Sequence, residues 1–205
     1  MKIFCVGRNY ADHAKELGND VDLKEPIIFL KPKSALLGKN VPFHYPSFTN
    51  ELHYECEIVL RICKNGRYIQ ETDAYKYYDA LSTGIDFTAR DLQNELKAKG
   101  LPWEKSKAFD DSAAIGKWLA FSPNKKLQNP FQFSLKKNNK IVQQGNTADM
   151  IFSFDKIIAN ISIYFSVNIG DIIFTGTPAG VGECLVGDVL EAFIEQEKML
   201  EIIIK

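Results

Sequence analysis

What the sequence lacks excludes several large functional classes. Its 25 Lys and Arg nearly balance 26 Asp and Glu, so the formal net charge of -1 provides neither a basic field for nucleic acid nor an acidic tail. No stretch approaches the roughly 18 consecutive apolar residues of a membrane span, and the apolar run at the N-terminus is too short for a signal peptide. We therefore expect a cytoplasmic protein with no nucleic-acid or membrane partner.

Paired cysteines are also missing. Cys5, Cys56, Cys63 and Cys184 form no C-x-x-C motif, which argues against a zinc ribbon or a redox centre. Three of them lie within apolar runs, so buried and reduced thiols are expected. With 205 residues and 45% hydrophobic content, the chain can bury an apolar core without a disulfide or a structural metal. One domain over residues 1–205 is expected.

The hydrophobic pattern that is present favours strands. Residues 52–62 alternate strictly, with apolar side chains on one face and Glu55, Glu57 and Arg61 among those on the other, which is the period of a sheet. Further strands are expected at residues 2–6, 26–30, 80–87, 118–121, 131–135, 140–144, 171–175, 189–194 and 199–204, with a hairpin arm at 67–70 after an Asn65-Gly66 turn. Helices are expected at residues 10–17, 72–79, 88–99 (capped by Thr88) and 153–165. Strands outnumber helices without regular alternation, which predicts a β-rich α+β fold.

Three carboxylates are candidates for a metal site. Glu55 and Glu57 are two residues apart on the expected strand, so both side chains point the same way and could offer hard oxygen ligands to magnesium or manganese. The alternative is that they belong to the solvated face of a half-exposed strand. Asp86 ends another expected strand, where it could face a cleft or cap the following helix.

Two pairs on expected helices could contribute polar chemistry. His13 and Glu16, three residues apart, could form a general base with a near-neutral pKa, or a simple surface pair. Arg90 and Gln93 have the same spacing and could bind a carboxylate, or lie on an exposed polar face. The glycine-rich segment 176–182 lacks the Lys-Ser/Thr of a phosphate-binding loop, and a backbone that approaches a small ligand is favoured instead.

The order of these motifs along nearly the whole chain resembles the fumarylacetoacetate hydrolase family, and its short members, the acylpyruvases and oxaloacetate decarboxylases, look most similar. The resemblance is carried by five segments: Val6-Gly-Arg-Asn-Tyr-Ala-Asp-His13-Ala-Lys-Glu16, His53-Tyr-Glu55-Cys-Glu57, Asp86-Phe-Thr-Ala-Arg90-Asp91-Leu-Gln93, Leu101-Pro-Trp-Glu-Lys-Ser-Lys107-Ala-Phe-Asp110 and the segment from Gly170 to Gly182. Ala108 departs from the pattern, because many relatives carry Gly or Ser after the lysine.

The resemblance implies a fold, a site and a reaction. The fold implied is a mixed β-sandwich or roll with a few short helices, usually a homodimer, in which residues 1–45 form an N-terminal segment with a mobile dyad. The roles implied are Mg²⁺ or Mn²⁺ ligands for Glu55, Glu57 and Asp86, a water-activating dyad for His13 and Glu16, a catalytic donor for Lys107, and substrate contacts for Arg90, Gln93 and Thr177, with Thr177 also expected to donate to the developing charge.

The activity implied is cleavage of a carbon–carbon bond in a short 2-keto acid, by hydrolysis of an acylpyruvate or decarboxylation of oxaloacetate. Isomerisation or hydration of unsaturated keto diacids is an alternative within the family. A non-catalytic, metal-bearing binding protein is a second alternative, against which His13, Glu16 and Lys107 argue.

Overall fold

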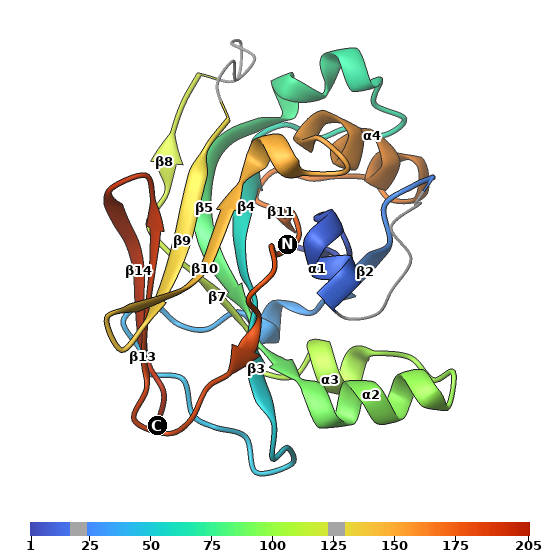
Figure 1. Cartoon of the computed structure of the whole chain (residues 1–205). Coiled ribbons are helices and arrows are strands. Elements are labelled where there is room, and N and C mark those ends of the chain that lie inside the picture. Colours follow the sequence, from blue (N-terminus) through green and yellow to red (C-terminus); the bar gives the residue numbers. More distant parts are fainter. Residues whose placement is uncertain (17–23, 123–129) are drawn as a thin grey trace.

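Strands make up most of the regular structure of this chain, for which a computed structural model describes residues 1–16, 24–122 and 130–205 (Figure 1). The largest sheet has the order β2-β1-β11-β4-β5-β7, with β8 beside β5. Only the pair β1–β11 is parallel in the described part of this sheet, so the sheet is mixed. Its strands are β1 (Ile3–Val6), β2 (Ile28–Lys31), β4 (Cys56–Ile62), β5 (Tyr78–Asp86), β7 (Ala113–Ile115), β8 (Leu119–Ala120) and β11 (Ile172–Phe174).

A second, antiparallel sheet lies beside the first and completes the core. Its order is β10-β9-β13-β14, and its strands are β9 (Gln132–Lys137), β10 (Lys140–Asn146), β13 (Val189–Ile194) and β14 (Glu197–Ile203). Leu60 and Leu81 from the large sheet belong to the same buried cluster as Leu135 and Leu190 from the small one. The expected β-rich α+β fold with a mixed, curled sheet arrangement is confirmed.

The long strand expected over residues 52–62 is divided at Glu55. β3 (Leu52–Tyr54) pairs with β12 (Gly182–Glu183) and β6 (Thr88–Ala89) in a small sheet of its own, whereas β4 starts at Cys56 in the large sheet. Glu55 lies between them, and its carbonyl still accepts from the Asp86 amide at 2.9 Å. The alternation in the sequence predicts the extended backbone, but it does not show where a strand changes its partner.

Four α-helices and three short 3-10 turns lie in the described part of the chain. The helices are α1 (Ala11–Glu16), α2 (Arg90–Ala98), α3 (Glu104–Lys107) and α4 (Phe154–Tyr164), and the turns are Lys33–Ala35, Glu71–Tyr77 and Thr147–Asp149. In Figure 1, α1 lies between α4 above and the α2–α3 pair below. Ser153 caps α4 by accepting from the Lys156 amide. The expected end of the first helix at Leu17 and Gly18 lies outside the described residues.

Two local predictions are wrong and two are confirmed. Residues 67–70 form no hairpin arm, because Gly66 bridges to Val167 and the Tyr68 amide donates to Ser162 near the end of α4. Thr88 does not cap α2, since it pairs within β6 and Ala89 is the N-cap residue. The strands expected at residues 131–135 and 140–144 form as β9 and β10, joined by a turn with positive φ at Asn138 and Asn139. All four cysteines are free, as expected, and three of them are buried.

Among the described residues, no helix is long and apolar enough to cross a membrane.

Candidate active site

The three carboxylates predicted as metal ligands come together inside the protein. Asp86 is the last residue of β5 and Glu57 is the second residue of β4, and these strands pair with Glu57 opposite Gly84. All three side chains are buried, and one oxygen from each lies within 4.8 Å of the others. The solvated-face alternative for Glu55 and Glu57 is therefore wrong, as is the helix-cap alternative for Asp86.

Positively charged side chains surround this carboxylate cluster, defined as Glu55, Glu57 and Asp86. Lys107, at the end of α3, donates to Glu55 Oε2 at 2.7 Å, to Asp86 Oδ2 at 2.9 Å and to the Thr88 hydroxyl at 2.7 Å. All three N–H groups of its ammonium are thus used. Although burial acts to lower the pKa of Lys107, the charges of Asp86 and Glu55 hold it above its usual value, so the side chain stays cationic.

Lys31 is a member of the site that the sequence analysis missed. Its ammonium lies 2.8 Å from Asp86 Oδ1 and forms a buried ion pair with it. It also donates to the Ser112 hydroxyl at 3.0 Å and to the backbone carbonyl of Lys107. In the sequence, Lys31 is simply the first polar residue after the apolar strand expected at residues 26–30. A lysine after an apolar run is usually exposed, so no local pattern reveals its burial.

The carboxyl groups of the cluster differ in their electrostatic balance. Burial acts to raise the pKa of Glu55, but the charges of Lys107 and Arg90 hold it below its usual value. Burial raises the pKa of Glu57 well above its usual range, and the nearby charges of Asp86 and Glu55 raise it further. The Gly176 amide, which donates to Glu57 Oε2 at 2.6 Å, opposes that shift in part.

This donor set fits a divalent cation. Lys107 already stands between Glu55 and Asp86, and the raised pKa of Glu57 means that burial and the neighbouring carboxylates disfavour its charged form, which a bound cation would stabilise. Carboxylate oxygens are hard ligands that suit Mg²⁺ or Mn²⁺, and each carboxylate has lone pairs for both a cation and a lysine.

The predicted dyad forms on α1. His13 is buried, and its Nδ1 lies 3.4 Å from Glu16 Oε2, so the surface-pair alternative is wrong for the imidazole. Burial lowers the pKa of His13, although the charge of Glu55 and the hydrogen bond to Glu16 act to raise it. Glu16 also accepts from the Gly180 amide at 3.2 Å. Part of residues 1–45 (17–23) lies outside the described residues, and the mobility expected of this segment stays a prediction.

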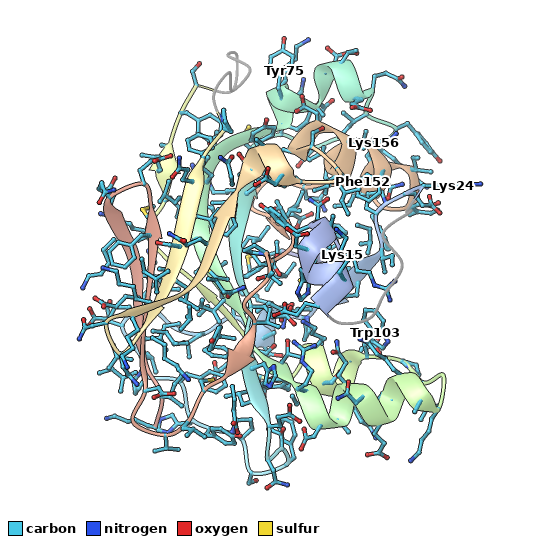
Figure 2. All side chains as sticks on the ribbon, viewed as in Figure 1. Lys15, Lys24, Tyr75, Trp103, Phe152 and Lys156 are labelled. Atoms are coloured by element: carbon cyan, nitrogen blue, oxygen red, sulfur yellow. The ribbon has the colours of Figure 1, made fainter. Side chains whose placement is uncertain are left out.

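Asn9, just before α1, anchors that helix to the glycine-rich segment. Its amide nitrogen donates to the carbonyls of Phe152 at 3.0 Å and Thr175 at 2.8 Å, and its oxygen accepts from the Phe152 amide. Figure 2 shows Phe152 above α1, Lys15 on it and Trp103 below it. In the sequence, Asn9 has no evident role, because an asparagine before a helix resembles an ordinary turn residue.

The three predicted substrate contacts are also buried near the cluster. Arg90 binds Glu55 and Gln93 at the start of α2, so the exposed-face alternative for this pair is wrong. Thr177 differs from its expected role as a donor, because its hydroxyl donates to the Cys56 carbonyl at 2.8 Å. In this arrangement, the Thr177 hydroxyl can only accept a hydrogen bond from a ligand.

Comparisons with known proteins find a matching family model and similar relatives. The family model described as fumarylacetoacetate (FAA) hydrolase C-terminal matches residues 2–203. A protein of Mus musculus named as a mitochondrial oxaloacetate tautomerase is 42% identical over 195 residues, which cover 94% of this chain and 86% of that protein.

Solved structures show the same fold. The fumarylpyruvate hydrolase of Pseudomonas aeruginosa, in complex with Mn²⁺ and pyruvate, has a TM-score of 0.92 and 34% identity over 100% of this chain and 89% of its own. The 5-carboxymethyl-2-hydroxymuconate delta-isomerase of Mycobacterium smegmatis has a TM-score of 0.85 and 28% identity over 99% and 78% of the two chains.

Proposed function

Because the chain belongs to the fumarylacetoacetate hydrolase family, we propose that it is a metal-dependent enzyme that cleaves a carbon–carbon bond of a short 2-keto acid. The substrate would be an acylpyruvate, cleaved by hydrolysis, or oxaloacetate, cleaved by decarboxylation. The observation that carries the proposal is the buried carboxylate cluster with a histidine–glutamate dyad on the adjacent helix. A related hydrolase that binds Mn²⁺ and pyruvate supports it.

Glu55, Glu57 and Asp86 would hold a Mg²⁺ or Mn²⁺ ion. When bound, such an ion supplies a Lewis acid that polarises a keto oxygen and stabilises negative charge developing there. Lys107 keeps Glu55 and Asp86 in place through its two ion pairs, and Arg90 fixes the other oxygen of Glu55. Arg90 and Gln93 would also orient the carboxylate of the substrate.

His13 would act as the general base for acylpyruvate hydrolysis. Because burial favours its neutral form, its ring can accept a proton from water that attacks the distal carbonyl. Glu16 orients the imidazole through Nδ1 and would stabilise the imidazolium once the proton has moved. Loss of CO₂ from oxaloacetate requires no attacking water, so this reaction depends less on the dyad.

Keto–enol tautomerisation of oxaloacetate is the second candidate, favoured by the name of the 42% identical mouse relative. In this reaction His13 would take the proton from the carbon beside the keto group, and the keto oxygen would gain a proton, without cleavage of a bond between carbons. Isomerisation of an unsaturated keto diacid uses the same proton movement, and the name of the Mycobacterium smegmatis isomerase keeps it as an alternative.

One substrate panel tests these candidates. Acetylpyruvate, fumarylpyruvate and oxaloacetate are each incubated with Mg²⁺, Mn²⁺ or EDTA, while pyruvate release and the enol absorbance are followed separately. We expect metal-dependent pyruvate release from at least one substrate. Enol–keto conversion of oxaloacetate without pyruvate release would replace cleavage by tautomerisation, and full activity in excess EDTA would contradict the metal-dependent proposal.

Assembly and location complete the proposal. We expect a homodimer of single-domain chains in the cytoplasm, with a small keto acid as the ligand and no nucleic-acid or membrane partner. Light scattering coupled to size-exclusion chromatography measures the mass, and a monomer would contradict the dimer. Cell fractionation tests the location, since the name of the mouse relative assigns that protein to mitochondria.

A further inference from the structure

Gln143, on β10, is a buried polar residue to which the proposed mechanism gives no role. A β-bulge in β10 turns its side chain inward: Ile141 pairs with Lys136 of β9, but the next pair is Gln143 with Leu135. Regular pairing would place Val142 opposite the buried Leu135 instead. The bulge therefore places an amide at an inward position that an apolar side chain would otherwise occupy. Such bulges are common beside functional sites.

Three hydrogen bonds fix the Gln143 amide. Its oxygen accepts from the Cys56 amide at 2.9 Å, and its nitrogen donates to the Thr177 hydroxyl at 2.8 Å and the Pro178 carbonyl at 3.0 Å. Cys56 N–H can only donate and Pro178 C=O can only accept, so the orientation of the amide is determined by chemistry. Both of its N–H groups are used.

These bonds form part of a closed ring around the backbone of one residue, Cys56. Cys56 N–H donates to Gln143, Gln143 donates to the Thr177 hydroxyl, and that hydroxyl donates to Cys56 C=O at 2.8 Å. Cys56 stands between Glu55 and Glu57, at the position where β3 ends and β4 begins. The ring thus holds the backbone between two carboxylates of the cluster and sets the direction of the Thr177 hydroxyl.

The glycine-rich segment lies directly against β10. A Cβ atom added to Gly180 would come within 2.4 Å of the Val142 carbonyl, at the bulge. One added to Gly145 of β10 would lie 3.0 Å from the Pro178 side chain. The second sheet therefore supports the segment that carries Thr177 and the Gly176 amide, which binds Glu57.

From this geometry we infer that Gln143 is a positioning residue, which holds Glu55 and Glu57 at the spacing that a divalent cation requires and presents the Thr177 hydroxyl as an acceptor for the hydroxyl of a substrate in its enol form. The inference rests on the proposed function. It extends the site to the second sheet, which contributes none of the expected ligands or substrate contacts.

The test is a titration of Mn²⁺ into metal-free protein, compared between wild type and Gln143→Met. Methionine matches the size of glutamine but forms none of the three hydrogen bonds. Loss of a partner that orients a metal ligand typically weakens metal binding about 10–100-fold, and we expect the Kd for Mn²⁺ to rise by that factor. Two controls accompany it: Gln144→Met changes an exposed glutamine of the same strand, and Leu190→Ala lowers stability from a core position on β13.

Each outcome decides a different point. Gln144→Met and Leu190→Ala should keep the Kd for Mn²⁺ within about twofold of wild type. If Gln143→Met also stays within about twofold, Gln143 has only a structural role and the inference is wrong. If Gln143→Met does not fold, Gln143→Asn takes its place. Asparagine keeps the amide, but its side chain is one methylene too short to close the ring, so the Kd for Mn²⁺ must rise in this variant too. With Mn²⁺ at saturation, Gln143→Met should still have a higher KM for substrate than wild type, because the Thr177 hydroxyl is no longer oriented. Wild-type protein that binds no Mn²⁺ would overturn the proposed function itself, and the role of Gln143 with it.

Discussion

The two halves of the candidate site are held in place by different means. The strand half, Glu55, Glu57 and Asp86, is buried where β3, β4 and β5 meet, with Lys31 of β2 and Lys107 of α3 against it. The helix half, His13 and Glu16, lies on a helix of six residues, and the Glu16 side chain is 35% exposed. A few polar contacts, from Asn9 and to the Gly180 amide, tie this helix to the glycine-rich segment.

The difference shows which part of the chemistry the fold preorganises. The carboxylates of the strand half are gathered at an energetic cost, because burial, and then the charges of Asp86 and Glu55, raise the pKa of Glu57, and the packing of the sheet keeps them together. A few polar contacts, and no strand pairing, hold the helix half, which can therefore be altered without disturbing the sheet. Cation binding and proton transfer should accordingly be separable by mutation, and the following predictions are tests of that separation.

The largest effect is expected for Glu57→Ala in the strand half. Loss of one anionic ligand removes the cation on which every proposed reaction depends, so acylpyruvate hydrolysis and oxaloacetate decarboxylation should both fall by about 10⁴-fold or more. Steady-state assays with Mn²⁺ measure the loss. Glu183→Ala, at an exposed glutamate on β12, is the matched control. A variant of Glu57 that kept either activity would show that the ligands are assigned wrongly.

His13→Ala should affect only the reactions that need a base. Hydrolysis of acetylpyruvate should slow by about 10²–10⁴-fold, the usual span for a lost general base, while decarboxylation of oxaloacetate changes less. His44→Ala, at an exposed histidine, serves as the control. An unchanged hydrolysis rate would show that His13 is not the general base. A large loss of decarboxylation would show that the two halves of the site do not act independently.

Glu16→Gln should give a smaller effect in the same direction. The amide can still accept from Gly180 N–H, but it cannot stabilise an imidazolium, so we expect hydrolysis to fall by roughly tenfold to a hundredfold. The ratio of kcat for acetylpyruvate to kcat for oxaloacetate is the measurement. Equal losses for the two substrates would mean that Glu16 closes the site and has no special role in water activation.

The smallest effect is a shift of the pH profile. Because burial lowers the pKa of His13 below 6.5, its neutral, proton-accepting form persists at pH 6.5 and is lost only as the pH falls through the lowered value. The acidic limb of kcat/KM for acylpyruvate hydrolysis should therefore lie below pH 6.5. In Glu16→Gln it should move lower still, since the hydrogen bond to Glu16 acts to raise this pKa. A limb above pH 6.5 in wild type would contradict the assignment.

The strand half could be predicted from the sequence better than its surroundings could. Alternation fixed the relative direction of Glu55 and Glu57, and the apolar run before Asp86 indicated a strand end. The division of the strand at Glu55 was not predictable, because β3 pairs with segments distant along the chain, Leu52 with Ala89 and Tyr54 with Gly182, whereas β4 pairs with β5.

Residues whose roles depend on tertiary burial were missed. Lys31 and Asn9 each look like ordinary ends of local elements, and their partners, such as Asp86 and Thr175, are distant along the chain. Gln143 follows two apolar residues in an amphipathic strand, and only the bulge at Val142 turns it inward. Local patterns report which face of an element a residue occupies, but they do not report a bulge or a distant hydrogen-bond partner.

The separation of the two halves is tested most directly by the affinity of metal-free protein for Mn²⁺, measured by isothermal titration calorimetry for wild type, His13→Ala and Glu57→Ala. We predict one Mn²⁺ per chain in wild type, an affinity within about twofold of it in His13→Ala, and a loss of more than about 100-fold in Glu57→Ala, because a direct ligand contributes more than a residue that orients one. An equal loss of affinity in His13→Ala and Glu57→Ala, or a Glu57→Ala protein that binds Mn²⁺ as wild type does, would contradict this account.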